Sequence, residues 1–147
     1  MYFNPTLISF RHYHFLIMAA PAQKGLRRFL KDLKKNRVEL LVRCCGLTYD
    51  EDALAPLGIV REKIKFADGQ LPSDEVVNNW LKIVDNFFDA PGTIRSDDPK
   101  KVIAVHCISG LDRAPLLVAM ALAHKGMNVQ IAVKVIQHKR KNAITTT

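Results

Sequence analysis

The stretch from 102 to 123, VIAVHCISGLDRAPLLVAMALA, constrains the fold more than any other part of the chain. An apolar run leads into His106-Cys107, a short loop with Gly110 follows, and Arg113 opens a second apolar segment. This pattern predicts a buried strand, a tight loop and a buried helix. The N–H groups at the start of that helix and the Arg113 guanidinium suit an anion, and the same field favours a thiolate at Cys107. We therefore expect a loop that holds an anion beside a nucleophilic cysteine.

Length and charge limit the possible classes of protein. The 147 residues suit a single domain, 1–147, that can bury a core without disulfides. Lys and Arg outnumber Asp and Glu by 22 to 14, and this formal charge of +8 favours phosphorylated substrates, anionic lipids or nucleic acid. Three cysteines without metal-type spacing indicate a reducing compartment, so we expect a cytoplasmic protein with no metal and no cofactor. No apolar run reaches the roughly 18 residues of a spanning helix.

Apolar patterns typical of strands and helices alternate along the chain. Strands are predicted within 7–18, 38–42, 59–64 and 102–105, and helices over 24–36, over 49–57 and after Ser73, Arg113 and Asn128, the last ending in the basic run 139–141. This alternation predicts an α/β fold with a central, mostly parallel sheet flanked by helices. Cys45 and Cys107 each follow a strand, so parallel strands could place them as neighbours at one edge of the sheet.

Residues 106–113, HCISGLDR, resemble the signature loop of cysteine-dependent protein tyrosine and dual-specificity phosphatases, in which His-Cys and Arg are separated by five residues. The wider sequence is similar to the regenerating-liver, or type IVA, family from about 15 to 144, with matching segments at 42–50 and 66–69. Ala114 agrees with that family, because most other relatives place Ser or Thr directly after the arginine. The resemblance implies the cysteine-based phosphatase fold.

The resemblance also implies a phosphoryl transfer in two steps. Cys107 as a thiolate attacks phosphorus and forms a phosphocysteine, while Arg113 and the loop N–H groups hold the phosphate oxygens. The loop comprises Ile108, Ser109, Gly110, Leu111, Asp112 and Arg113. Turn statistics alone would make Asp68 a turn residue before glycine, but the resemblance makes it the acid for the leaving group and the base for water. His106 would support the loop and the thiolate by hydrogen bonding.

Cys45 matches the family's second cysteine, which can form a disulfide with the nucleophile. A resolving thiol beside a reactive one is typical of a reversible redox sensor. The resemblance therefore implies a redox pair of Cys45 and Cys107, although the sequence alone equally allows Cys45 to be a buried, inert residue. Cys44 is assigned to packing.

Three features depart from the family's pattern. Ile64-Lys65 stands where the family's acid loop, the loop that carries Asp68 at 66–69, usually has Trp-Pro before the phenylalanine, which predicts a different hinge for that loop. Asp112 replaces a glycine beside the anion, where it would repel substrate or take part in proton transfer. The sequence ends at Thr147 without the family's polybasic segment and prenylated cysteine, so we expect any membrane contact to depend on exposed Lys and Arg alone.

These observations favour a cytoplasmic protein phosphatase acting on phosphotyrosine, and on phosphoserine or phosphothreonine as a wider range, with peripheral contact to anionic membrane surfaces. Ala114 offers no hydroxyl to the returning thiolate, so slow turnover is expected. One alternative is a near-pseudoenzyme that binds a membrane protein, of the magnesium-transporter type suggested by the resemblance. Another is a phosphoinositide phosphatase, because Asp112 also resembles the myotubularins. A rhodanese-like sulfur transferase ranks last, and no nucleic-acid partner is expected.

Overall fold

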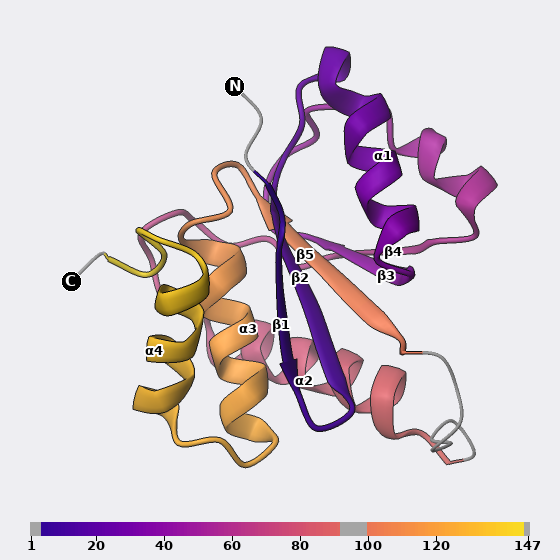
Figure 1. Cartoon of the computed structure of the whole chain (residues 1–147). Helices are drawn as coiled ribbons and strands as arrows, with labels where there is room; N and C mark the ends of the chain where they lie inside the picture. The colour runs from indigo at the N-terminus through magenta and orange to yellow at the C-terminus, as the bar shows by residue number, and fades with distance from the viewer. Residues whose placement is uncertain (1–3, 92–99, 146–147) are drawn as a thin grey trace.

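A five-stranded sheet runs through the computed structural model, which describes residues 4–91 and 100–145 (Figure 1). The strands are β1 (Thr6–Phe10), β2 (Tyr13–Ala19), β3 (Val38–Arg43), β4 (Val60–Lys63) and β5 (Val102–Cys107). Their order across the sheet is β1-β2-β5-β3-β4. The β1–β2 hairpin is antiparallel and all other pairs are parallel, which confirms the predicted mostly parallel α/β sheet.

Helices connect these strands and cover both faces of the sheet. They are α1 (Leu26–Lys35), α2 (Asp74–Asp89), α3 (Arg113–His124) and α4 (Val129–Lys139), with short 3-10 helices η1 (Gln23–Gly25) and η2 (Glu51–Leu57). The short helix predicted over 49–57 is a 3-10 helix that begins at Glu51, after the Asp50 N-cap, and has Pro56 inside it. The predicted helix starts are confirmed at Ser73 and Asn128, whose side chains accept N–H groups from the first turns of α2 and α4.

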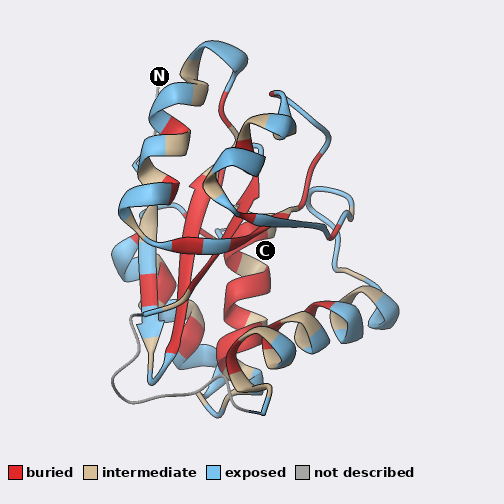
Figure 2. Cartoon of the chain, turned by 90° about the vertical axis from the view of Figure 1, so that its right-hand side faces the viewer, coloured by how far each residue is buried: buried red, intermediate tan, exposed pale blue. Residues whose placement is uncertain are grey.

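The side chains of β2 alternate between two apolar clusters. Phe15 and Ile17 face the cluster that includes residues of α2, α3 and α4, whereas Leu16 and Met18 face the cluster of α1 and η2. Figure 1 shows these helices on the two sides of the sheet, and Figure 2 shows that the buried residues line the strands and the inner sides of the helices. The core therefore fixes the central strands from both faces, including the one that ends at Cys107.

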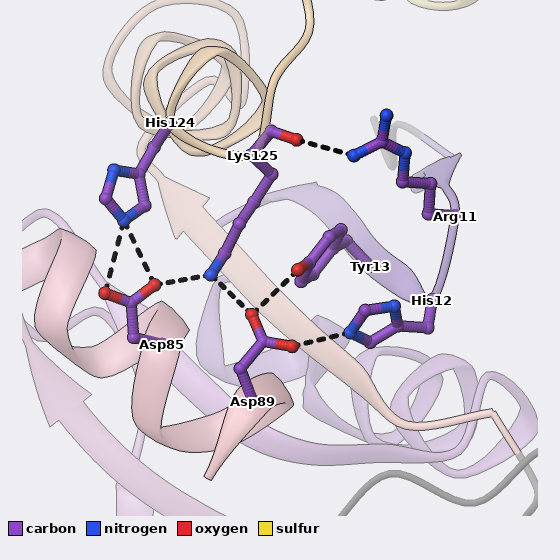
Figure 3. Close-up of polar contacts among 7 residues, drawn as sticks. All are labelled: Arg11, His12, Tyr13, Asp85, Asp89, His124 and Lys125. Carbon is purple, nitrogen blue, oxygen red and sulfur yellow. Dashed lines mark hydrogen bonds and ion pairs between the residues drawn. The ribbon is translucent and has the colours of Figure 1, made fainter.

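A polar cluster fastens the β1–β2 hairpin to the C-terminal ends of α2 and α3 (Figure 3). The Lys125 ammonium lies 2.5 Å from both Asp85 and Asp89, and Asp89 also accepts from the Tyr13 hydroxyl at 2.7 Å and contacts His12 at 2.6 Å. Burial disfavours the Asp89 carboxylate, but hydrogen bonds from Lys125, His12 and Tyr13 outweigh it and lower the pKa of Asp89 to about 2. This cluster lies at the hairpin end of the sheet, away from Cys107.

The C-terminal ends of the three central strands, β2, β5 and β3, lie side by side at the end of the sheet opposite to this cluster. Ala19 of β2 pairs with Cys107 of β5, and Arg43 of β3 pairs with His106. The chain leaves β5 through the 108–112 loop and enters α3 at Arg113. No helix in the described ranges is long and apolar enough to cross a membrane.

Candidate active site

Cys107 lies at the end of β5 with its thiol surrounded by backbone donors. The residue is 1% exposed, and the N–H groups of Gly110 and Ala114 point to Sγ from 3.2 and 3.5 Å. The N-terminal turn of α3 adds the positive end of the helix dipole. These donors and the dipole stabilise negative charge on sulfur, as a nucleophile requires.

His106 is fully buried and fixes the peptide that follows it. Its Nε2 lies 3.0 Å from the Tyr49 hydroxyl, and its side chain also hydrogen-bonds the backbone of Cys107. Burial lowers the pKa of His106 to about 4, so the ring is neutral near pH 7. A neutral ring that accepts from Tyr49 at Nε2 keeps its proton on Nδ1, where it can donate to the Cys107 carbonyl. The Ala20 N–H donates to the same carbonyl at 2.7 Å.

The Arg113 guanidinium is held by two carbonyl groups, and its buried Nε–H has no hydrogen-bond partner. Its Nη1 donates to Cys44 O at 3.1 Å and to Phe66 O at 3.2 Å. Its Nε is the single buried side-chain nitrogen or oxygen without a hydrogen-bond partner in the described part of the chain. Asp68 Oδ1 lies 3.7 Å from that nitrogen, beyond hydrogen-bond distance. Arg113 is therefore oriented before any ligand binds, with a buried donor available to an anion.

Asp68 and Asp112 form a pair of carboxyl groups across the mouth of the site. A hydrogen bond between the two side chains is the main cause that raises the pKa of Asp112, and burial adds to it. The Asp112 carboxyl also accepts from the backbone of Gly69. Asp112 precedes α3 but its side chain does not cap the helix, because it is turned toward the acid loop. The two carboxyl groups thus favour sharing a proton.

The contacts of Asp112 and Arg113 also tie the acid loop to the phosphate loop. Arg113 donates to Phe66 O, and Asp112 contacts Asp68 and Gly69. These contacts add to the anchoring of Ile64, which is buried and donates its N–H to Arg43 O at 2.9 Å. The position of the acid loop therefore depends partly on residues of the signature segment.

Cys45 lies at the edge of this site with its thiol reduced. All three cysteines are free and buried, and Cys45 Sγ is 3.9 Å from His106 Nδ1. Burial raises the pKa of Cys45, while the Arg113 guanidinium opposes this shift. Burial likewise raises the pKa of Cys44, whose carbonyl accepts from Arg113. Cys44 thus packs in the core as expected, and its backbone in addition positions Arg113.

The structure brings together the residues predicted for phosphoryl transfer, while Cys45 contacts His106 and no hydrogen bond or disulfide joins it to Cys107 among the described residues. Cys107, Arg113, His106 and Asp112 belong to one segment, and Asp68 reaches it from the acid loop. Tyr49 and Arg140, both in contact with this segment, were not predicted. The sequence positions of these two residues relative to 106–113 give no sign of these contacts, because tertiary packing brings both residues to the site. The described residues contain no group of three side chains suited to a metal ion.

Comparisons with known proteins agree with this geometry. No family model matches the chain. It is 42% identical over 142 residues to the probable protein tyrosine phosphatase type IVA A of Dictyostelium discoideum, covering 96% of this chain and 81% of that protein. It is 40% identical over 143 residues to human protein tyrosine phosphatase type IVA 3, covering 97% and 78%. A solved protein tyrosine phosphatase from Leishmania major superposes with a TM-score of 0.84 at 36% identity, covering 97% of this chain and 93% of that one.

A strand that ends in a buried cysteine, followed by a loop of N–H donors and an arginine, defines the cysteine-dependent phosphatases, and this chain is an enzyme of that class. Within the class, it belongs to the protein tyrosine phosphatase type IVA family. The resemblance seen in residues 106–113 and in the flanking segments is thereby confirmed.

The carboxyl pair gives a direct prediction. Asp68→Ala removes the hydrogen bond that raises the pKa of Asp112, so that pKa is expected to fall toward the ordinary value for aspartate, 3.8. Carboxyl carbon chemical shifts measured against pH would report the change, and Asp112→Asn would assign the resonance. An Asp112 titration that is the same in wild type and Asp68→Ala would show that the carboxyl groups do not interact.

Proposed function

We propose that this enzyme hydrolyses phosphotyrosine in proteins, and phosphoserine or phosphothreonine as a wider range, through a phosphocysteine intermediate. The observation that carries the proposal is the buried Nε–H of Arg113, which has no hydrogen-bond partner, in the loop that follows a cysteine whose sulfur already accepts from two backbone N–H groups. A phosphate group supplies oxygens for the arginine and an electrophilic phosphorus for the sulfur. Burial of an unpaired donor is unfavourable, and a bound phosphate would satisfy it.

In the first step, Cys107 Sγ forms a bond to phosphorus as the bond to the ester oxygen breaks. Asp68, in its protonated form, gives its proton to that oxygen, so the leaving group departs as an alcohol or a phenol. In the second step, a water molecule attacks phosphorus, Asp68 takes a proton from it, and the thiolate leaves. Arg113 and the loop N–H groups hold the equatorial oxygens in both steps.

Asp112 keeps the proton of this acid within the site. Its contact with Asp68 raises the pKa of Asp112, so Asp112 can hold a proton next to the acid. This proton also limits the negative charge that faces the phosphate. Asp112 therefore takes part in proton transfer in this proposal, and it does not simply repel the substrate.

Ala114 makes the second step slow in this proposal. Its N–H lies 3.5 Å from Cys107 Sγ, but its methyl side chain offers the sulfur no hydroxyl donor. The thiolate that leaves phosphocysteine is therefore stabilised by the backbone alone. The intermediate should accumulate during turnover.

We predict that rapid mixing with an aryl phosphate gives a burst of leaving group close to one equivalent per enzyme, followed by a slow steady rate. Ala114→Ser should raise the steady rate about tenfold, because a hydroxyl donor to a developing charge contributes about 1 to 2 kcal/mol. Ala114→Gly, which also lacks a hydroxyl, is the control and should not speed turnover. A wild-type time course without a burst would contradict slow breakdown of the intermediate.

The surroundings of the site favour a protein substrate. Each of the three loops around the site presents an exposed apolar side chain, Leu47 at 60%, Leu71 at 81% and Ile108 at 51% exposure. Exposed apolar groups around a polar site are typical of surfaces that bind proteins. The same rim supports the second candidate function, a binding module with little activity that docks an acidic segment of a membrane protein.

A phosphoinositide substrate is favoured by other residues. The exposed face of α1 carries Arg27, Lys31 and Lys34, which suits an anionic membrane surface. PTPMT1, solved in complex with PI(5)P, shares the fold with a TM-score of 0.67 at 16% identity. This likeness concerns the fold alone, so the basic face and Asp112 are what support this candidate.

A panel of phosphopeptides and of phosphoinositides in vesicles would distinguish these functions. We predict release of phosphate from phosphotyrosine peptides, at a higher kcat/KM than from vesicle lipids, and no release by Cys107→Ser. Faster hydrolysis of the lipids would instead establish a phosphoinositide phosphatase. Negligible hydrolysis of every substrate, with partner binding unchanged in Cys107→Ser, would establish a binding module.

We also propose that Cys45 protects Cys107 during oxidation by hydrogen peroxide. Peroxide oxidises the Cys107 thiolate to a sulfenic acid, and the Cys45 thiol then displaces water from it to form a disulfide. The position of Cys45 beside His106, the neighbour of Cys107, supports this pairing. Reduction by a dithiol would restore both thiols.

After peroxide treatment, dithiothreitol should therefore restore the activity of wild type but not that of Cys45→Ser. In this variant Cys107 would be oxidised further to sulfinic acid, which is irreversible. Cys44→Ser is the matched control and should recover like wild type. Peptide mass spectrometry should show a linkage between Cys45 and Cys107. A linkage through Cys44, or full recovery by Cys45→Ser, would overturn the assignment.

A further inference from the structure

A buried arginine contacts the phosphate loop at Gly110. Arg140, the residue after α4, is 6% exposed, and its Nε–H donates to Gly110 O at 2.6 Å. Its Nη1 donates to Asn4 O at 2.9 Å and to Thr6 Oγ1 at 2.8 Å. One guanidinium thus joins the phosphate loop to the start of β1 through its Nε and Nη1 donors.

The bond to Gly110 O determines where the following N–H points. In a trans peptide the carbonyl and the next N–H point in opposite directions, so fixing one fixes the other. Because Arg140 holds Gly110 O outside the loop, the Leu111 N–H points away from Arg140 and donates to Ser109 Oγ at 3.0 Å. The next carbonyl, Leu111 O, accepts from Ile144 N at 2.8 Å, in the segment just after Arg140. Two successive peptides of the loop are therefore oriented by one short segment.

Gly110 itself is enclosed between Arg140 and β2. Its φ of +71° favours glycine, and a Cβ there would lie 2.5 Å from Arg140 Nη2 and 2.8 Å from the Met18 carbonyl atoms. Gly110 also gives its N–H to Cys107 Sγ at 3.2 Å. A small movement of Gly110 would therefore change both the anion site and the donor to the thiolate.

We propose that Arg140 is a positioning residue for the phosphate loop: by holding Gly110 O it fixes Gly110, whose N–H donates to the Cys107 thiolate, and the peptide whose N–H donates to Ser109 Oγ inside the loop. This inference rests on the proposed function, since it assumes that the loop binds phosphate. Arg140 does not touch the substrate. It acts through Gly110 and Leu111, and catalysis is sensitive to such positioning because small displacements of binding groups greatly reduce rates.

The test compares Arg140→Met with wild type in two kinds of measurement that overall stability does not control, one on the anion site and one on the Cys107 thiol. We expect inhibition by orthovanadate, a phosphate analogue, to weaken about tenfold or more, and kcat/KM for an aryl phosphate to fall by at least as much. We also expect alkylation of Cys107 by iodoacetamide to require a higher pH, because the Gly110 N–H no longer holds the sulfur. Both are measured well below the melting temperature of each variant.

Three further variants separate positioning from simple cross-linking. Arg140→Lys can still donate to Gly110 O, so it should restore much of the orthovanadate affinity and of the alkylation profile. Thr6→Val removes a hydroxyl partner of Arg140 Nη1 but leaves Gly110 untouched, so it should lower Tm and leave orthovanadate inhibition within about twofold of wild type. Lys141→Met removes the exposed neighbouring charge and should change neither measurement.

If Arg140→Met equals wild type in orthovanadate inhibition and in the pH dependence of Cys107 alkylation, the inference is overturned. Arg140 would then be only a structural cross-link. If Arg140→Met does not fold, Arg140→Lys and Thr6→Val decide the question, since equal losses of orthovanadate affinity in both would also overturn it. A wild-type enzyme that neither binds orthovanadate nor hydrolyses an aryl phosphate would instead contradict the proposed function.

Discussion

The orientation of the peptide groups between Cys107 and Arg113 is the constraint on which the rest of the site depends. N–H groups can face an anion only if the carbonyls point outward, and each outward carbonyl then needs a donor. Ala20 supplies one for Cys107 O, Arg140 for Gly110 O and Ile144 for Leu111 O. The end of β2 and the segment that follows α4 therefore act as the outer wall of the anion site.

Few groups in the site carry a charge that would repel a bound phosphate or pair with the groups that bind it. His106 is neutral because it is buried, and it serves as a hydrogen-bonding link from Tyr49 to the Cys107 backbone. Asp112 is shifted toward its neutral form by Asp68, which limits the repulsion that an added carboxylate would otherwise create. Arg113 is fixed by the carbonyls of Cys44 and Phe66. The replacement of a glycine by Asp112 is thereby accommodated beside an anion site.

The sequence was sufficient to predict the fold and the centre of the site because these depend on local patterns. The strand, loop and helix around Cys107 follow from apolar periodicity, and the family motif names Asp68. The 3-10 form of 51–57 and the partners Tyr49 and Arg140 could not be predicted. Arg140 lies in a basic run that resembles a solvated surface, and its burial depends on how α4 packs against β1 and the loop. Such contacts join residues that are distant in the sequence, so no periodic pattern in the sequence indicates them.

The place of β5 in the sheet has a consequence for folding. This strand is inserted between β2 and β3 although it is the last strand in the chain, so pairs such as Phe15 with Ile103 join distant parts of the sequence. Long-range parallel pairing is slow to form, and until it forms β2 and β3 each expose an unpaired edge that could associate with other chains. The nucleophile lies on the strand that completes the sheet. A partly folded chain consequently has no assembled site, and the anion-binding loop is built in the same event that removes the exposed edges.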